Sequence, residues 1–264
     1  MIRVFFAEWR KLRRPALFIG TMLTVVGFTS LITSLLFLML DSRRGGGGRD
    51  GQIVNRMTLE MPHGLSVGFS SAAGFLGLIA LCIFASQTAQ EYTHGTLRNL
   101  LVRQPRRLTL LAGKFLAMCL FALISVILSA IVSVSLAFAL SGKAKVVTTA
   151  WSTSAARSGL AHTFVNVLIS VIASGTIGMI LGLLLRSPIS SISIGVAWLL
   201  VVENILAATL KNSAKWMPGQ MMNTVAAGGD FNASYSHALW VLSAYLAVGV
   251  LVAGYLFRRR DVTN

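Results

Sequence analysis

Residues 109–140 read TLLAGKFLAMCLFALISVILSAIVSVSLAFAL, an apolar run with almost no charge. About 20 apolar residues suffice for a helix to cross a hydrocarbon layer about 30 Å thick, so this run predicts a membrane span that tilts or projects beyond the bilayer. The whole chain is similar: 55% of its 264 residues are hydrophobic, 12% are charged, and the mean hydropathy is +0.75. A soluble domain carries about a quarter of its residues as charges, so the sequence predicts a protein dissolved in lipid.

Six apolar stretches are long enough to form membrane-spanning helices. They are residues 16–40, 65–86, 109–140, 159–185, 189–210 and 237–257. Only residues 186–188 separate the fourth from the fifth, which predicts a tight turn in which Pro188 opens the next helix. Little room is left for a soluble domain. The sequence therefore predicts one all-α membrane domain over residues 1–264.

The charge of the chain indicates its orientation in the membrane. It has 23 Lys and Arg against 8 Asp and Glu, a net charge of +15. In a soluble protein this excess would suggest nucleic acid, but in a membrane protein Lys and Arg gather on the cytoplasmic side. Basic clusters lie directly before the first span and after the last, at residues 258–260. We therefore expect both termini in the cytoplasm and no nucleic-acid partner.

One basic group falls outside the cell in this orientation. Arg43, Arg44 and Arg49 flank four consecutive glycines in the outer segment of residues 41–64. Glycine-rich segments are flexible, so we expect a mobile link there. A basic site for an anionic lipid or peptide is the alternative.

Two spans carry small residues at every fourth position. The series are Ser125, Ser129, Ser133 and Ala137 in the third span, and Ser170, Ser174, Gly178 and Gly182 in the fourth. Such stripes let helices approach closely in lipid, so they predict helix packing. A contact of these serines with a transported substrate is the alternative.

Residues 1–15 predict an amphipathic helix at the membrane surface. Apolar residues such as Phe5 and Trp9 fall at helical spacing on one face, while Lys11 and four arginines occupy the rest. Glu8 is the single acid of this helix. It forms either an ordinary helix pair with Lys11 or a contact with a partner protein.

The inner segment of residues 87–108 predicts a second short amphipathic helix. Thr96 can cap this helix after Gly95, and Pro105 ends it. Three leucines then form its apolar face, namely Leu97, Leu100 and Leu101. Such a helix rests on lipid or fills a groove on a soluble partner.

The order of residues in this segment resembles the intracellular loop of ABC-2-type transporter permeases. The resemblance rests on Glu91, Gly95–Thr96, the Leu100–Leu101 pair, Pro105, Arg107 and Lys114. The sequence Glu8-Trp9-Arg10-Lys11, in the amphipathic segment before the first span, and the six spans fit the same family. The resemblance therefore covers nearly the whole chain.

The resemblance implies the membrane subunit of an ABC exporter of the G-like (type V) fold. Two permease copies, or one copy and a related permease, would sit on two cytoplasmic ATPase subunits. Residues 1–15 would be the connecting helix, with Phe5, Glu8, Trp9 and Lys11 in its contacts. The loop helix would be the coupling helix that enters a groove on the ATPase, with Glu91, Gly95, Thr96, Leu97, Leu100, Leu101 and Arg107 in the coupling site.

Residues 211–236 are too interrupted for a span and too apolar for a free loop. They include Trp216, Met217 and Pro218, which suit the outer interface, where Trp is enriched. In the family that the chain resembles, this region forms short re-entrant helices before the last span.

Glu203, followed by Asn204, is the one acid predicted inside a span. An intramembrane carboxylate is costly and marks a possible functional site. It is either a hydrogen-bonded acid inside the bundle or, with Asn204, part of a pathway or gate that contacts a cationic substrate.

Phosphate-binding and catalytic motifs are absent from the sequence. No Gly-x-x-x-x-Gly-Lys-[Ser/Thr] occurs, so an ATPase that drives transport must be another polypeptide. The four histidines have no metal-ligand spacing, and no catalytic constellation is found. We therefore expect no enzyme activity, metal or cofactor on this chain, with ATP and Mg²⁺ on the partner.

The sequence thus predicts a multi-pass permease subunit of an ATP-driven exporter in a bacterial plasma (inner) membrane. Its cargo would be a drug, peptide, lipid or ion. The alternatives are a stand-alone secondary transporter and a membrane immunity or scaffold protein that moves nothing.

Overall fold

The computed structural model describes residues 2–40, 56–95, 107–210, 212–230 and 233–259. Across these ranges every regular element is a helix, and six helical segments are long and apolar enough to cross a membrane. This confirms the prediction of an all-α, multi-pass membrane protein. The first four spans are α2 (Pro15–Leu38), α4 (Gly64–Thr93), α6 (Arg107–Ser141) and α7 (Ser154–Leu185). The fifth joins α8 (Pro188–Ala197), a π-helical turn (Trp198–Val202) and α9 (Glu203–Thr209), and the sixth is α11 (Tyr235–Arg259).

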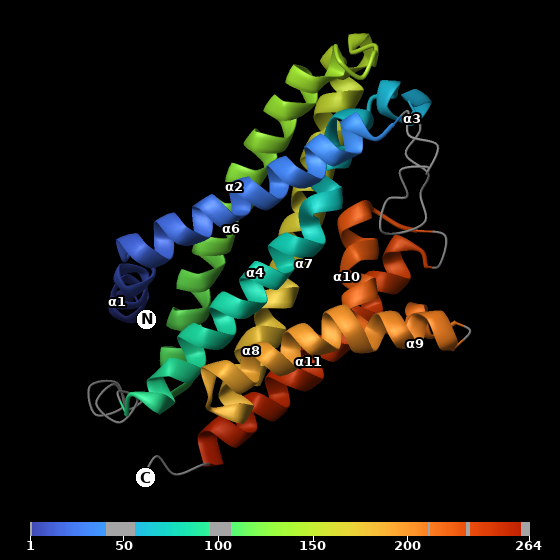
Figure 1. Cartoon of the computed structure of the whole chain (residues 1–264). Helices are drawn as coiled ribbons and strands as arrows, with labels where there is room; N and C mark the ends of the chain where they lie inside the picture. The colour runs from blue at the N-terminus through green and yellow to red at the C-terminus, as the bar shows by residue number, and fades with distance from the viewer. Residues whose placement is uncertain (1, 41–55, 96–106, 211, 231–232, 260–264) are drawn as a thin grey trace.

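Within the described ranges, five shorter helices connect or precede the spans. They are α1 (Ile2–Leu12), α3 (Arg56–Glu60), a 3-10 turn (Thr149–Ser152), a second 3-10 turn (Ser213–Lys215) and α10 (Pro218–Ala227). The first of them, α1, and the last turns of α11 lie toward the same end of the bundle (Figure 1).

The centre of the bundle is the pair of α4 and α7, and α8, α9 and α11 lie along one side of it (Figure 1). In the most apolar stretch of α7, 61% of the residues are buried, against 17% in the fifth and sixth spans. The last two spans therefore keep most of their surface for lipid or for another protein.

The packing interpretation of the small-residue stripes is confirmed. A Cβ atom added at Gly178 of α7 would lie 2.3 Å from the carbonyl oxygen of Leu81 in α4, so only glycine permits this approach. Between α2 and α6, the Ser129 hydroxyl lies 2.8 Å from that of Thr29, and a second Ser–Thr pair follows one turn later. These contacts join helices through small or paired polar groups, as expected in lipid.

The tight turn between the fourth and fifth spans is also confirmed. Helix α7 ends at Leu185, Arg186 adopts a left-handed backbone with φ of 56°, and α8 begins at Pro188. Pro188 suits the first helical position, where its missing N–H is no loss.

The predicted start of the inner segment at residue 87 is wrong. Helix α4 continues to Thr93, so Gln87 and Glu91 lie on a helix and not in a loop. Hydropathy marks only the apolar part of a helix, while the backbone hydrogen bonds continue into the polar turns. The predicted coupling helix lies outside the described residues from Thr96 to residue 106, and so does the glycine-rich stretch within residues 41–55.

At the opposite end of the bundle, Trp151 packs between α2, α3 and α6. Its indole Nε1 donates a hydrogen bond to the Leu59 carbonyl at 2.8 Å, and the rings of Phe37 and Phe138 meet it edge-on. This small core was not predictable from the sequence, because its members come from four separate elements.

The α4–α7 contact predicts opposite effects for one substitution at two glycines of the same helix. Gly178→Ala forces a methyl group against the backbone of α4, and we expect it to lower the free energy of unfolding by about 1–3 kcal/mol. At Gly159 no atom lies within 4 Å of an added Cβ. We therefore expect Gly159→Ala not to lower the free energy of unfolding and to raise it by up to about 1 kcal/mol. Thermal unfolding in mild detergent measures both, and equal stability of the two variants would contradict the proposed contact.

Candidate functional site

Among the residues that the structure describes, charged side chains are buried at two places in the bundle. The first is a group of four residues at the end of the bundle that carries α1, and we name Glu8, Lys11, Glu91 and Lys114 the charge cluster. The second is Glu203 in the fifth span. Because a buried charge is costly unless it is paired, both places are candidates for function.

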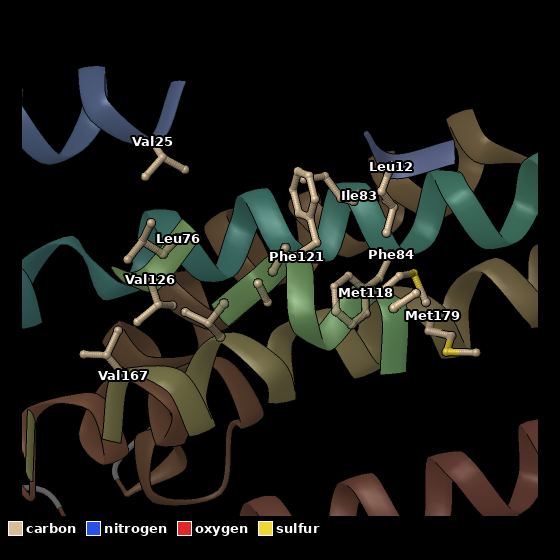
Figure 2. Close-up of a cluster of buried hydrophobic side chains, with 14 of the residues drawn as sticks. Leu12, Val25, Leu76, Ile83, Phe84, Met118, Phe121, Val126, Val167 and Met179 are labelled. Carbon is tan, nitrogen blue, oxygen red and sulfur yellow. The ribbon is translucent and has the colours of Figure 1, made fainter. Parts of the chain in front are cut away.

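Helix α1 presents one buried face to the bundle, formed by Val4, Glu8 and Leu12. Leu12 lies among the side chains of Ile83 and Phe84 (Figure 2). The spacing of four residues puts Glu8 in the middle of this apolar face. Its carboxylate therefore enters the protein and needs counter-charges there.

Lys114 of α6 supplies one counter-charge and lies at the centre of the charge cluster. Its Nζ atom is 2.9 Å from Glu8 Oε2 and 2.8 Å from Glu91 Oε1, and it donates a hydrogen bond to the Gln87 carbonyl at 2.9 Å. An ammonium group has three donors, so each has an acceptor. With a side chain only 2% exposed, Lys114 obtains all its stabilisation from these groups.

Lys11 closes the charge cluster on its outer side. Its Nζ atom is 2.5 Å from Glu8 Oε1 and 2.9 Å from Glu91 Oε1. Two acids and two bases thus alternate in a closed ring that ties α1 to α4 and α6. The predicted helix pair of Glu8 with Lys11 is present, and the structure adds Glu91 and Lys114 to it.

The charges of the ring stabilise one another. Burial alone would raise the pKa of Glu8, but the charge of Lys114 and hydrogen bonds from Lys11 outweigh it, and the pKa lies below its usual value. Burial would lower the pKa of Lys11, but Glu91 and Glu8 raise it above its usual value. Glu8 and Lys11 are therefore both ionised at neutral pH.

A hollow of about 400 Å³ opens beside the charge cluster, at the ends of α1, α2 and α4. Its polar lining consists of Lys11, Arg14, Gln87, Gln90, Glu91 and His94. The hollow exposes the outer side of the ring, where Lys11 keeps 34% of its side chain exposed. An incoming polar group can therefore reach Lys11 without opening the bundle.

Other predicted members of the coupling and connecting sites lie in different surroundings. Phe5 and Trp9 are half-buried and pack against the main core. Gly95 follows α4 with φ of 64°, and Arg107 is the first residue of α6. Thr96, Leu97, Leu100 and Leu101 lie outside the described residues.

Lys114 was not among the predicted site residues. It is the only charged residue in residues 109–140, and this was the signal that could have found it. A lysine within an apolar span needs a partner, and Glu8 and Glu91 were acids of the inner segments that could provide one.

Glu203 is fully buried and caps the first turn of α10. Its Oε1 accepts a hydrogen bond from the backbone N–H of Gly219 at 3.0 Å, and its Oε2 accepts one from that of Gln220 at 3.1 Å. A carboxylate is favourable there because the first N–H groups of a helix lack internal partners. A Cβ atom at Gly219 would lie 2.6 Å from Glu203 Oε2, so a larger residue at this position would displace the carboxylate.

Asn204 does not take part in this contact. Its side chain is exposed, and its amide nitrogen donates hydrogen bonds back to the carbonyls of Leu200 at 2.8 Å and Leu199 at 3.4 Å in the π-helical turn. The structure therefore separates the pair: Glu203 forms hydrogen bonds inside the bundle, while Asn204 faces outward. Of the two interpretations of Glu203, the contacts favour the hydrogen-bonded acid.

Removing the central lysine tests the energetic role of the charge cluster. Lys114→Met leaves two buried carboxylates without their shared counter-charge, and we expect a loss of about 3–5 kcal/mol in the free energy of unfolding. Adding Glu8→Gln should recover part of this loss. The control is Lys143→Met, which changes an exposed lysine at the other end of α6 and should leave detergent unfolding unchanged. A Lys114→Met protein as stable as its parent would refute the role of the ring.

Hydrogen exchange tests the cap on α10. Glu203→Leu leaves the N–H groups of Gly219 and Gln220 without acceptors, at a cost of about 1–3 kcal/mol each. We expect these two amides to exchange at least about tenfold faster in amide hydrogen–deuterium exchange. Asn204→Leu is the matched control and should leave both rates unchanged, whereas protection that persists in Glu203→Leu would show that Glu203 is not their partner.

Comparison with known sequences covers the part of the chain that holds most of these residues. Residues 63–263 match the model of the family described as Protein of unknown function (DUF2705). The match includes Glu91, Lys114 and Glu203, and Glu8 and Lys11 precede it. No curated protein sequence matches the chain. Because the match extends over most of the chain, the protein belongs to the DUF2705 family.

Proposed function

We propose that the chain is the permease subunit of an ATP-driven ABC exporter and that a separate ATPase supplies the energy. The observation that carries this proposal is the charge cluster, which ties the amphipathic α1 to the ends of α4 and α6. The inner segment resembles that of ABC-2-type permeases. In those terms, the charge cluster would connect the connecting helix to the coupling helix.

The geometry suits the transfer of force. The proposed coupling helix lies in the connection between α4 and α6, and each of these helices contributes a member of the ring. Glu91 lies in the last turn of α4, and Lys114 lies two turns into α6. A displacement of the connection would therefore move α1, α4 and α6 together, because the ring cannot open without leaving charges unpaired in the protein.

The proposed cycle begins when ATP binding closes the ATPase dimer. The coupling helix follows this movement, α1 passes it to α2, and rearranged span packing opens a central path outward. In this arrangement both termini lie in the cytoplasm of a bacterial cell, the chain spans the inner membrane, and α10 is a re-entrant helix on the outer side. The cargo is a drug, peptide, lipid or ion.

A second permease copy is part of the proposal. The fifth and sixth spans are the least buried, and the fifth exposes the polar side chain of Asn204 within an apolar stretch. A carboxamide is poorly placed against hydrocarbon and well placed against another helix. This surface therefore favours a homodimer or a pair with a related permease.

Copurification tests the partner directly. When the tagged chain is isolated in mild detergent from its own cells, we expect a Walker-type ATPase to accompany it. The double variant Leu97→Asp, Leu100→Asp should insert into the membrane normally, yet lose both the ATPase and the stimulation of ATP hydrolysis in proteoliposomes. Met57→Asp, at an exposed position of α3 at the opposite end, is the control and should keep both.

Two results would overturn the proposal. One is unchanged stimulation of ATP hydrolysis by the double variant. The other is purification of the chain alone together with uptake driven by an ion gradient, which would identify a stand-alone secondary transporter.

A further inference from the structure

Helix α1 has an exposed face opposite the one that packs on the bundle. Its buried residues are Val4, Glu8 and Leu12. In a helix of about 3.6 residues per turn, another set of positions lines the far side. The residues at these positions are all exposed, and we name them the arginine face: Ile2, Arg3, Phe6, Arg10 and Arg13.

The arginine face is the side of α1 that is left for a partner. An amphipathic helix at a membrane surface ordinarily buries its apolar face in lipid. In α1 the bundle already covers that face, because Leu12 belongs to the main core and Phe5 and Trp9 pack against it. Any partner of α1 outside the bundle therefore meets the arginines.

The positive charge of this face is not balanced by nearby acids. Glu8 is the only acid in residues 1–14, and it points into the charge cluster, where two acids and two bases balance one another. Among the described residues, no carboxylate forms an ion pair with Arg3, Arg10 or Arg13. The arginine face therefore attracts a partner of negative charge.

Two observations favour a lipid surface over an acidic protein as this partner. Ile2 is 73% exposed and Phe6 is 54% exposed, and both lie among the arginines, a combination that suits the boundary between headgroups and acyl chains. The chain then bends at Arg14, whose backbone is extended with ψ of 129°, and the first membrane span begins at Pro15 (Figure 1). The arginine face therefore ends at the membrane boundary.

We propose that the arginine face binds anionic phospholipid headgroups at the bilayer surface, with Ile2 and Phe6 between them. Each Lys or Arg near an anionic membrane surface strengthens the attraction about fivefold. The long arginine side chains reach the phosphates while their methylene groups remain against apolar surface. Helix α1 is then held on two sides, by the charge cluster and by lipid. The proposal does not depend on the transport function.

Native mass spectrometry of the full chain in mild detergent tests the proposal with phosphatidylglycerol and phosphatidylcholine of identical acyl chains. We expect phosphatidylglycerol to bind at least about tenfold better, because several arginines each contribute about fivefold. The triple variant Arg3→Gln, Arg10→Gln, Arg13→Gln should lower this preference at least about tenfold. If the triple variant does not fold, Arg10→Gln alone should lower the preference about fivefold.

The matched control removes the same charge from three exposed positions at the other end of the bundle. It is the triple variant Lys143→Gln, Lys145→Gln, Arg157→Gln, and it should keep the preference for phosphatidylglycerol. Equal binding of the two lipids by the unmodified chain, or equal losses in the two triple variants, overturns the proposal. An arginine variant that keeps the preference but loses a copurifying protein also overturns it, because the face then docks an acidic protein.

Discussion

The ammonium group of Lys114 sets the arrangement of three helices. This group lies in an apolar part of the protein, where an unpaired charge is costly. Helix α6 can therefore pack in the bundle only if carboxylates contact Lys114. Glu8 comes from α1, and Glu91 comes from the last turn of α4. An amphipathic helix at a membrane surface can take many positions, and this pairing selects one of them for α1.

A second constraint, the close approach of helices, determines how the spans pack against one another. Helices in lipid gain no hydrophobic driving force from meeting each other, so they depend on shape and on paired polar groups. Gly178 brings α7 against the backbone of α4, and the hydroxyl pair of Thr29 and Ser129 joins α2 to α6. The fifth and sixth spans lack comparable burial, which leaves room for a second copy.

Much of the fold could be predicted because lipid restricts the possibilities. An apolar run must form a helix there, since no water satisfies the backbone, so the number of spans followed from hydropathy. The turn at Pro188 and the small-residue stripes were predictable for similar local reasons. The end of α4 was not predictable, because Gln87 and Glu91 are polar residues typical of a loop until their tertiary partners are known.

The sequence by itself determined that the chain has six segments long and apolar enough to cross a membrane, that its first helix is amphipathic, and that no phosphate-binding loop is present. It also contained each charged residue of the candidate site, but as separate observations in segments far apart in the chain. Only the tertiary structure decided that Glu8, Glu91 and Lys114 meet, and that Glu203 caps α10 while Asn204 faces outward. The reason is physical: hydropathy depends on neighbours along the chain, whereas a buried charge finds its counter-charge through space.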